Sequence, residues 1–478
     1  MMWVPSFILH FKRGCKMGEK KKKWYTILAG TLVFIVTVCG ITGGLNYLYV
    51  DDTDEFSRYM LHDFYKQEEN IDRLYIGSSH VFCGINPVIL DDINGENNYN
   101  LATGTQQLIT SYYLLREADR KHDIEKVYLD LYYDCTTEGL GNFHEYETIP
   151  YSWIVLNQMK PSVNKLSYIL HLSEPRYYYM SFLAFTRYKE QLFQPDYIAN
   201  IVERKQTDVY KNYEYEHIRK VDGKEYVMHS AQKGFMTYNG VIEAGGFYSD
   251  VPETPMKENP LTEESLEYLL KIVEYCKNRG IVLTCIGCPI SDFQLQANGT
   301  YDNYVSQIRS LAKEYGFSYY DFNLCKEEYL DVADNCYWSD QGHLNTAGAE
   351  KFTEFLGKFL LAEENGEVTY QDCFYDSYAQ KMKNTQERIF GLEAIKEETQ
   401  EGVEYSIRPI HNVHESEKQF LSVKVWKIPE NGEKEILFDT VSGEDALQVI
   451  LPVDEHGTLH IEAGFAGEEV SNWVKISY

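Results

Sequence analysis

The stretch "RLYIGSSHVF" at residues 73–82 runs from an apolar segment into a glycine, two serines and a histidine. Leu74, Tyr75 and Ile76 are apolar, which predicts a short buried strand that ends at Gly77. Similar strand-like runs follow at residues 97–103, 126–134, 281–287 and 317–322. Helical patterns occur between or after them at residues 106–122, 261–280, 301–316 and 346–364. Strands that alternate with helices predict an α/β fold with a mostly parallel sheet covered by helices on both faces.

This α/β pattern extends over residues 67–365, but a segment rich in Tyr, Phe and Met interrupts it at about residues 141–260. Helical patches within the segment predict a largely helical insertion. A charged, helix-like linker is predicted from about residue 374 to 401. Residues 402–478 contain short alternating runs separated by turn signals, which predict a small antiparallel β-sandwich. Its role stays open between carbohydrate contact, protein contact and structural support.

The N-terminus combines a basic arm with a long apolar run. Residues 1–23 hold seven Lys and Arg residues against one acid, and residues 24–50 hold no charged residue. About 20 apolar residues suffice to cross a bilayer core. The positive-inside rule therefore predicts a single-pass anchor in the cell membrane, with a cytoplasmic N-terminus and an extracellular body. A cleaved signal peptide is the alternative, and the start of translation stays open between Met1 and Met17.

The composition excludes some functions. The chain carries a formal net charge of -28, and such an acidic body repels nucleic acid, so we expect no nucleic-acid partner. The closely spaced pair Cys285 and Cys288 lies in a strand-like run rather than at a turn before a helix. No second pair of ligands accompanies it, so we predict buried inert thiols, no metal site and no cofactor.

The serines of the opening stretch fall at the carboxyl end of a predicted strand, where parallel sheets bind their ligands. A serine nucleophile needs a base within reach, and that base needs an orienting acid. The stretch "SDQGHLNTAG" at residues 339–348 offers Asp340 and His343, whose spacing puts both side chains on one side of a turn. His80 adjoins Ser79, but neighbouring side chains diverge, so we predict that His80 is not the base.

These two motifs resemble those of the SGNH/GDSL hydrolase superfamily. "IGSSH" matches its G-x-S block after the first strand, and "SDQGHLNTAGAEKF" matches its D-x-x-H block before the last helix. The resemblance covers about residues 70–145 and 260–360. It implies a three-layer α/β fold with Ser79 as nucleophile, His343 as base and Asp340 as orienting acid.

The resemblance also implies an oxyanion hole formed by the N–H groups of Ser79 and Gly104. After the third predicted strand the chain reads "LDLYYD" instead of the family's G-x-N-D block, so Gln106 is the candidate for the missing side-chain donor. Ser78 replaces the aspartate of G-D-S. The membrane-anchored branch that includes DltD, a protein of D-alanyl-lipoteichoic-acid biosynthesis, also has serine there.

Together these features predict a membrane-anchored serine esterase or acyltransferase. The resemblance implies acyl esters of a cell-envelope polysaccharide or teichoic acid as substrates, and a membrane O-acyltransferase as a candidate partner. The alternative is a non-catalytic envelope scaffold that binds glycans or proteins.

Overall fold

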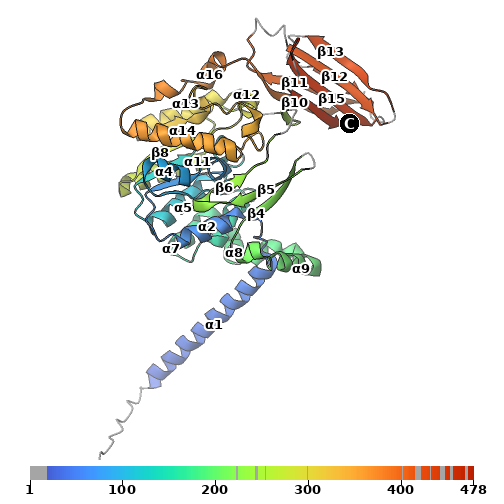
Figure 1. The fold of residues 1–478 in the computed structure, drawn as a ribbon. Helices are drawn as coiled ribbons and strands as arrows, with labels where there is room; N and C mark the ends of the chain where they lie inside the picture. Colours follow the sequence, from blue (N-terminus) through green and yellow to red (C-terminus); the bar gives the residue numbers. More distant parts are fainter. Residues whose placement is uncertain are drawn as a thin grey trace, which may run out of the picture.

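The computed structural model describes the chain from residue 19 onward. Within this span it leaves out residues 222–223, 243–245, 253–254, 299, 401, 415–420, 431, 442–446, 453–455 and 469–471. Figure 1 shows a long N-terminal helix, a central body of helices and strands, and a block of C-terminal strands.

A five-stranded sheet forms the centre of the body. Its strands follow the order β2-β1-β3-β8-β9, and every neighbouring pair is parallel. They are β1 (Arg73–Ile76), β2 (Asn98–Asn100), β3 (Lys126–Asp130), β8 (Val282–Gly287) and β9 (Ser318–Asp321). Nearly all of their residues are buried, as expected for a sheet covered on both faces. The predicted α/β class with a parallel sheet is confirmed.

Helices connect these strands. The pair α4–α14 packs together, and so does the pair α5–α11. Right-handed crossovers put these two pairs on opposite faces of the sheet. The helices of this body are α2 (Phe56–Lys66), α3 (Ser79–Gly84), α4 (Pro87–Asn94), α5 (Leu108–Asp119), α11 (Glu263–Arg279), α12 (Asp292–Asn298), α13 (Tyr301–Tyr315), α14 (Thr346–Glu364), α15 (Tyr370–Cys373) and α16 (Tyr378–Asn384).

The insertion begins with helices and ends with strands. Its helical part comprises α6 (Ile149–Gln158), α7 (Val163–Leu172), α8 (Tyr178–Phe182), the 3-10 segment η3 (Ala184–Gln191), α9 (Pro195–Arg204) and α10 (Asp208–Lys211). An antiparallel sheet follows, formed by β4 (Glu216–Val221), β5 (Lys224–Ser230) and β6 (Met236–Tyr238). This sheet was not predicted, because its strands are polar and half-exposed and lack a clear apolar alternation.

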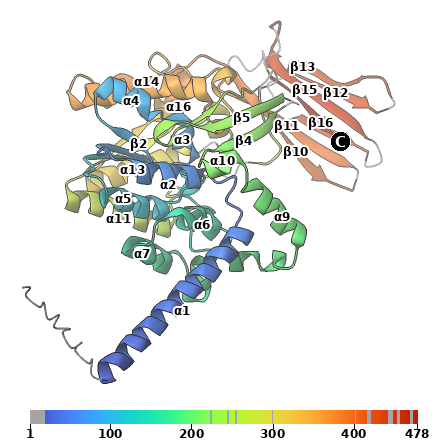
Figure 2. The same ribbon diagram turned by 60° about the horizontal axis from the view of Figure 1, so that its bottom comes forward.

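Helix α1 (Glu19–Tyr49) projects away from the body (Figures 1 and 2). Within its segment Lys23–Tyr49, an 18-residue window has a mean hydropathy of 2.1 and no buried residue. The helix is therefore long and apolar enough to cross a membrane, although signal sequences share these properties. Its last turn contacts η3 and α9 of the insertion.

The C-terminal region contains two four-stranded sheets with the orders β14-β11-β10-β7 and β13-β12-β15-β16. One cluster of buried apolar side chains, including Leu392, Ile407, Val425 and Ile461, is contributed by both sheets and makes the region sandwich-like. The strands are β7 (Phe247–Ser249), β10 (Ile389–Glu398), β11 (Val403–His411), β12 (Leu421–Pro429), β13 (Glu435–Val441), β14 (Leu447–Leu451), β15 (Gly457–Phe465) and β16 (Asn472–Ser477).

The start of this region differs from the predicted helix-like linker. Strand β10 pairs along its length with β11, and its residues 389–394 are buried. The acidic and basic residues that suggest a helix lie at its exposed end, residues 396–398. Strand β7, from the end of the insertion, pairs in parallel with β10, so the β-region begins before residue 402 and includes part of the insertion.

Candidate active site

Gly77 brings the end of β1 close to the end of β3. A Cβ atom at position 77 would lie 2.5 Å from Cβ of Asp130 and 2.7 Å from a methyl carbon of Val81. A side chain does not fit there, so only glycine allows this approach. The chain then enters α3, with Ser78 as N-cap and Ser79 as the first helical residue. Both serines are thereby fixed at the carboxyl edge of the sheet.

Ser79, His343 and Asp340 form a continuous chain of hydrogen bonds. Oγ of Ser79 lies 2.7 Å from Nε2 of His343, and Nδ1 of His343 lies 2.8 Å from Oδ1 of Asp340. The two blocks are 264 residues apart in the sequence, and the fold brings them together. This geometry is the arrangement in which a histidine can take the proton of a serine hydroxyl while a carboxylate orients its ring.

Asp340 is held in place by more than its histidine. Its Oδ1 accepts the backbone N–H groups of Gly342 at 3.0 Å and His343 at 2.9 Å. Its Oδ2 accepts a hydrogen bond from Nη1 of Arg219 at 2.9 Å. Burial alone would raise the pKa of Asp340, but the hydrogen bonds from His343 and Arg219 outweigh it and lower that pKa below its usual range. Asp340 is therefore a firm carboxylate at neutral pH.

Arg219 lies on β4 of the insertion and was not among the predicted site residues. The sequence carries no signal for it, because an arginine in a polar strand is ordinary surface material. Its pairing with Asp340 shows that the insertion takes part in the site.

A second, buried network lies beneath the first. Oγ of Ser78 lies 3.2 Å from Oδ2 of Asp130 and 3.1 Å from Nδ1 of His80. The His80 ring lies 4.0 Å from the ring of Tyr132 and stacks at 4.6 Å on that of His343. Burial, followed by the neighbouring His343, lowers the pKa of His80, so its ring is neutral. His80 hydrogen-bonds to Ser78 and supports the base from below.

The two predicted oxyanion donors besides Ser79 lie in the loop after β2. Gly104 has open space around its Cβ position, and the next residue, Thr105, has a left-handed φ of 51°. Gln106 is buried; its side-chain oxygen accepts from Thr103 Oγ1 at 2.8 Å, and its Nε2 donates to Ser111 Oγ at 3.0 Å. The Gln106 amide thus makes its hydrogen bonds inside the protein and is not bonded to the triad of Ser79, His343 and Asp340.

A cleft of about 550 Å³ adjoins the triad. The β4–β7 part of the insertion contributes one wall, and the loop that carries Asp340 and His343 contributes another. Tyr132, Phe247 and Tyr248 add aromatic surface, and Gln294 adds an amide. A substrate that reaches His343 through this cleft would meet both apolar and polar groups, as in most small-molecule sites.

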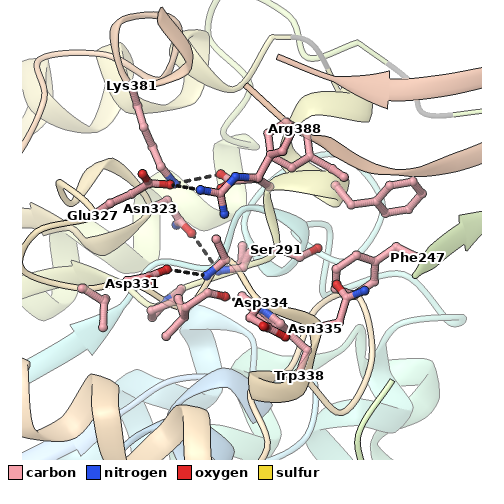
Figure 3. A pocket seen from close by; sticks show the side chains of 18 of the residues that line it. Phe247, Ser291, Asn323, Glu327, Asp331, Asp334, Asn335, Trp338, Lys381 and Arg388 are labelled. Atoms are coloured by element: carbon pink, nitrogen blue, oxygen red, sulfur yellow. Dashed lines mark hydrogen bonds and ion pairs between the residues drawn. The ribbon is translucent and has the colours of Figure 1, made fainter. Parts of the chain in front are cut away.

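Another cavity, of about 370 Å³, lies between the α/β body and the start of β10 (Figure 3). Its cations are compensated, because Arg388 pairs with Glu327 at 3.0 Å and Lys381 pairs with Asp292 at 2.8 Å. This cavity offers no chain of nucleophile, base and acid among its described lining residues.

Cys285 and Cys288 are buried free thiols whose pKa is raised by burial, which disfavours the reactive thiolate. Within the part of the chain that the structure describes, no group of three or more His, Cys, Asp or Glu residues is arranged to hold a metal ion. Among the described residues around the cleft, Ser79, His343 and Asp340 are the one set of side chains arranged as a nucleophile, a base and an acid.

Comparison with known protein families gives no matching family model, and comparison with curated proteins gives no match. Any functional conclusion for this chain therefore depends on the site itself.

Proposed function

We propose that the protein is a membrane-anchored, extracytoplasmic serine esterase or acyltransferase of SGNH type. The observation that supports this proposal most is the hydrogen-bonded chain from Ser79 through His343 to Asp340. Its support does not come from either motif alone, since short G-S-S and D-x-x-H segments are common. It comes from their convergence at the carboxyl edge of a parallel sheet, beside a cleft.

In the proposed reaction, Oγ of Ser79 attacks the acyl carbon of an ester while Nε2 of His343 accepts the hydroxyl proton. The ester C–O bond then breaks, and His343 returns the proton to the departing alcohol oxygen. The result is an acyl group on Ser79. Water or a second hydroxyl compound, deprotonated by His343, attacks this acyl-enzyme and releases Ser79. Asp340 remains ionised throughout and stabilises the imidazolium form of His343.

The proposed substrate class rests on the proposed location. An anchored enzyme facing outward would meet acyl esters of cell-envelope polysaccharides or teichoic acids. Transfer to a polymer hydroxyl would need an acyl ester as donor, and a membrane O-acyltransferase is the proposed partner that supplies it. Backbone N–H groups of Ser79 and Gly104 are the proposed oxyanion donors. With Gln106 engaged elsewhere, one donor fewer than usual would be present, which lowers rates by about 10²- to 10³-fold per donor.

That missing donor favours a second candidate, a non-catalytic scaffold that binds envelope glycans or proteins. Labelling with a fluorophosphonate probe separates the two, because only an activated serine reacts. The full chain in detergent should take one label at Ser79, and Ser79→Ala should abolish it. Ser78→Ala is the matched control and should retain most of the label. A wild-type chain that is folded yet takes no label would overturn the enzymatic proposal.

A further inference from the structure

A pocket of about 300 Å³ lies where the last turn of α1 meets the insertion. The end of α1 is fixed there by several bonds. The hydroxyl of Tyr49 donates to the carbonyl of Leu192 at 2.8 Å, and the backbone N–H of Phe185 donates to Oδ1 of Asn46 at 3.0 Å. Figures 1 and 2 both show α9 beside this end of α1. The pocket therefore lies at the level where α1 leaves the body.

Two cations at this pocket lack an acidic partner. Lys165 lines the pocket, and its Nζ donates to the carbonyl of Met159 at 2.9 Å. Arg187 does not line the pocket itself, but it donates from Nη1 to Oδ1 of Asn157, a lining residue, at 3.1 Å. Its guanidinium also donates to the carbonyl of Met180 at 2.7 Å and lies 4.2 Å from the centre of the Trp153 ring. Nη2 of Arg187 is buried and has no hydrogen-bond partner. No ion pair among the described residues includes either cation.

Burial disfavours the charged forms of Lys165 and Arg187. Burial, with the nearby Arg187 as the second cause, lowers the pKa of Lys165 to about 8. Burial also lowers the pKa of Arg187 to about 10. The one acid that attracts Lys165, Glu117, makes its own contacts with Arg120, Tyr65 and Asn164. Burying unpaired cations is costly, so an anion in the pocket would relieve a real penalty.

Lys205, the third cation of this pocket, shows the contrast. Its Nζ pairs with Asp52 at 3.0 Å and donates to the carbonyls of Tyr47 and Val50 at the end of α1. Its charge is thus compensated by Asp52, the one acid among the described residues that line the pocket. Lys165 and Arg187 form no such pair with an acid among the described residues.

The surface around the pocket is unusually apolar for a face exposed to water. Val163, Leu166 and Leu170 are exposed, and their spacing puts them on one face of α7. Phe182 lines the pocket with its ring half-exposed, and Phe193, which follows the Leu192 partner of Tyr49, is 94% exposed. Aromatic and aliphatic side chains around a charged pocket are typical of surfaces that rest in a bilayer interface.

We propose that this pocket binds the phosphate of an anionic phospholipid, with the apolar side chains of α7, α8 and the η3–α9 turn resting in the bilayer that α1 enters. The charge of the pocket matches a phosphate, and its position is continuous with the apolar surface of α1. The inference rests on α1 being a retained anchor. It does not rest on catalysis by Ser79, which makes no contact with this pocket.

Native mass spectrometry of the full chain in detergent tests the proposal, with equal amounts of palmitoyl-oleoyl-phosphatidylglycerol and palmitoyl-oleoyl-phosphatidylcholine as competing probes. Wild-type protein should retain one molecule of phosphatidylglycerol in preference to phosphatidylcholine. Lys165→Met and Arg187→Met should each weaken that binding by roughly tenfold or more, because the first removes a charge-assisted contact and the second removes a nearby positive charge. Lys189→Gln, which removes an exposed lysine of η3, is the matched control and should bind as wild type.

Arg187→Lys keeps the charge and should retain part of the preference, so the test stands even if Arg187→Met folds poorly. Equal binding of both lipids, or unchanged binding in Lys165→Met and Arg187→Met, would overturn the proposal. Inorganic phosphate added to the protein in phosphatidylcholine nanodiscs is a further test. If it raises the Tm as much as phosphatidylglycerol does, the site binds a soluble anion and the proposal is overturned. Fluorophosphonate labelling of the same samples reports the Ser79 site separately, so the two proposals can fail independently.

Discussion

Arg219 of the insertion donates a hydrogen bond at 2.9 Å to Asp340, the carboxylate that holds the ring of His343. The insertion therefore does more than line the cleft. It supplies Arg219, a cation that is linked to the proposed base His343 through Asp340. A cation in this position has two effects. It fixes the orientation of Asp340, and its hydrogen bond helps to lower the pKa of that carboxyl below its usual range.

Replacing Arg219 by Gln should therefore slow esterase turnover, because Asp340 loses one of the contacts that orient it. Because the pair is partly exposed, we expect kcat to fall by only about three- to tenfold. Turnover of p-nitrophenyl acetate at neutral pH measures this effect. Arg219→Lys should restore part of the turnover, and Lys220→Gln, at an exposed neighbour, should leave it unchanged. Wild-type turnover in Arg219→Gln would show that the ion pair with Asp340 does not contribute to the reaction.

Replacing Asp340 by Asn should have a much larger effect. The amide keeps the shape of the side chain but presents an N–H where Nδ1–H of His343 needs an acceptor, so the wrong tautomer faces Ser79. We expect kcat to fall by roughly 10³-fold or more. Thermal unfolding should confirm that the variant folds. Asp331→Asn, in the separate cavity of Figure 3, should retain full turnover; a loss of less than tenfold in Asp340→Asn would argue against the proposed triad.

The parallel sheet and the two motifs of the proposed triad can be predicted from the sequence because each depends on local pattern. Apolar runs give the strands, and a glycine followed by serines marks the end of the first one. Arg219 could not be found this way, since it reaches Asp340 across 121 residues through the packing of an unpredicted strand. The hydrogen bond from Gln106 to Ser111 could not be predicted either, because the sequence does not show whether a glutamine faces a cleft or the interior. Strand β10 was missed for a related reason, as its charged end resembles a helix while its buried half pairs with β11.

The buried carboxyl of Asp130 should make stability depend on pH in an unusual direction. Burial raises its pKa from 3.8 to about 6, despite hydrogen bonds from Cys288 N–H and Ser78. Between about pH 4 and 6 the folded state therefore binds more protons than the unfolded state, so this group's contribution to stability falls as pH rises. The full change amounts to about 3 kcal/mol. Relative to Asp130→Asn, wild-type protein should lose up to this amount between pH 4 and 7, as measured by urea unfolding. A gain of stability with rising pH would contradict the assignment.

Gly77→Ala tests whether the close approach of β1 and β3 sets the position of Ser79. The added methyl group would lie 2.5 Å from Cβ of Asp130, so one of the two strand ends must shift. Overpacking of this kind costs about 1–3 kcal/mol in the free energy of unfolding. A shift of the strand end also moves Ser79 away from Nε2 of His343, so fluorophosphonate labelling should slow by at least tenfold, because misplacement by about 1 Å costs on the order of 10²-fold. Gly104→Ala, whose methyl group would meet no atom within 4 Å, is the control for stability and should unfold as wild type. If Gly77→Ala is destabilised yet labels at the wild-type rate, the approach of β1 and β3 supports the fold but does not position the nucleophile.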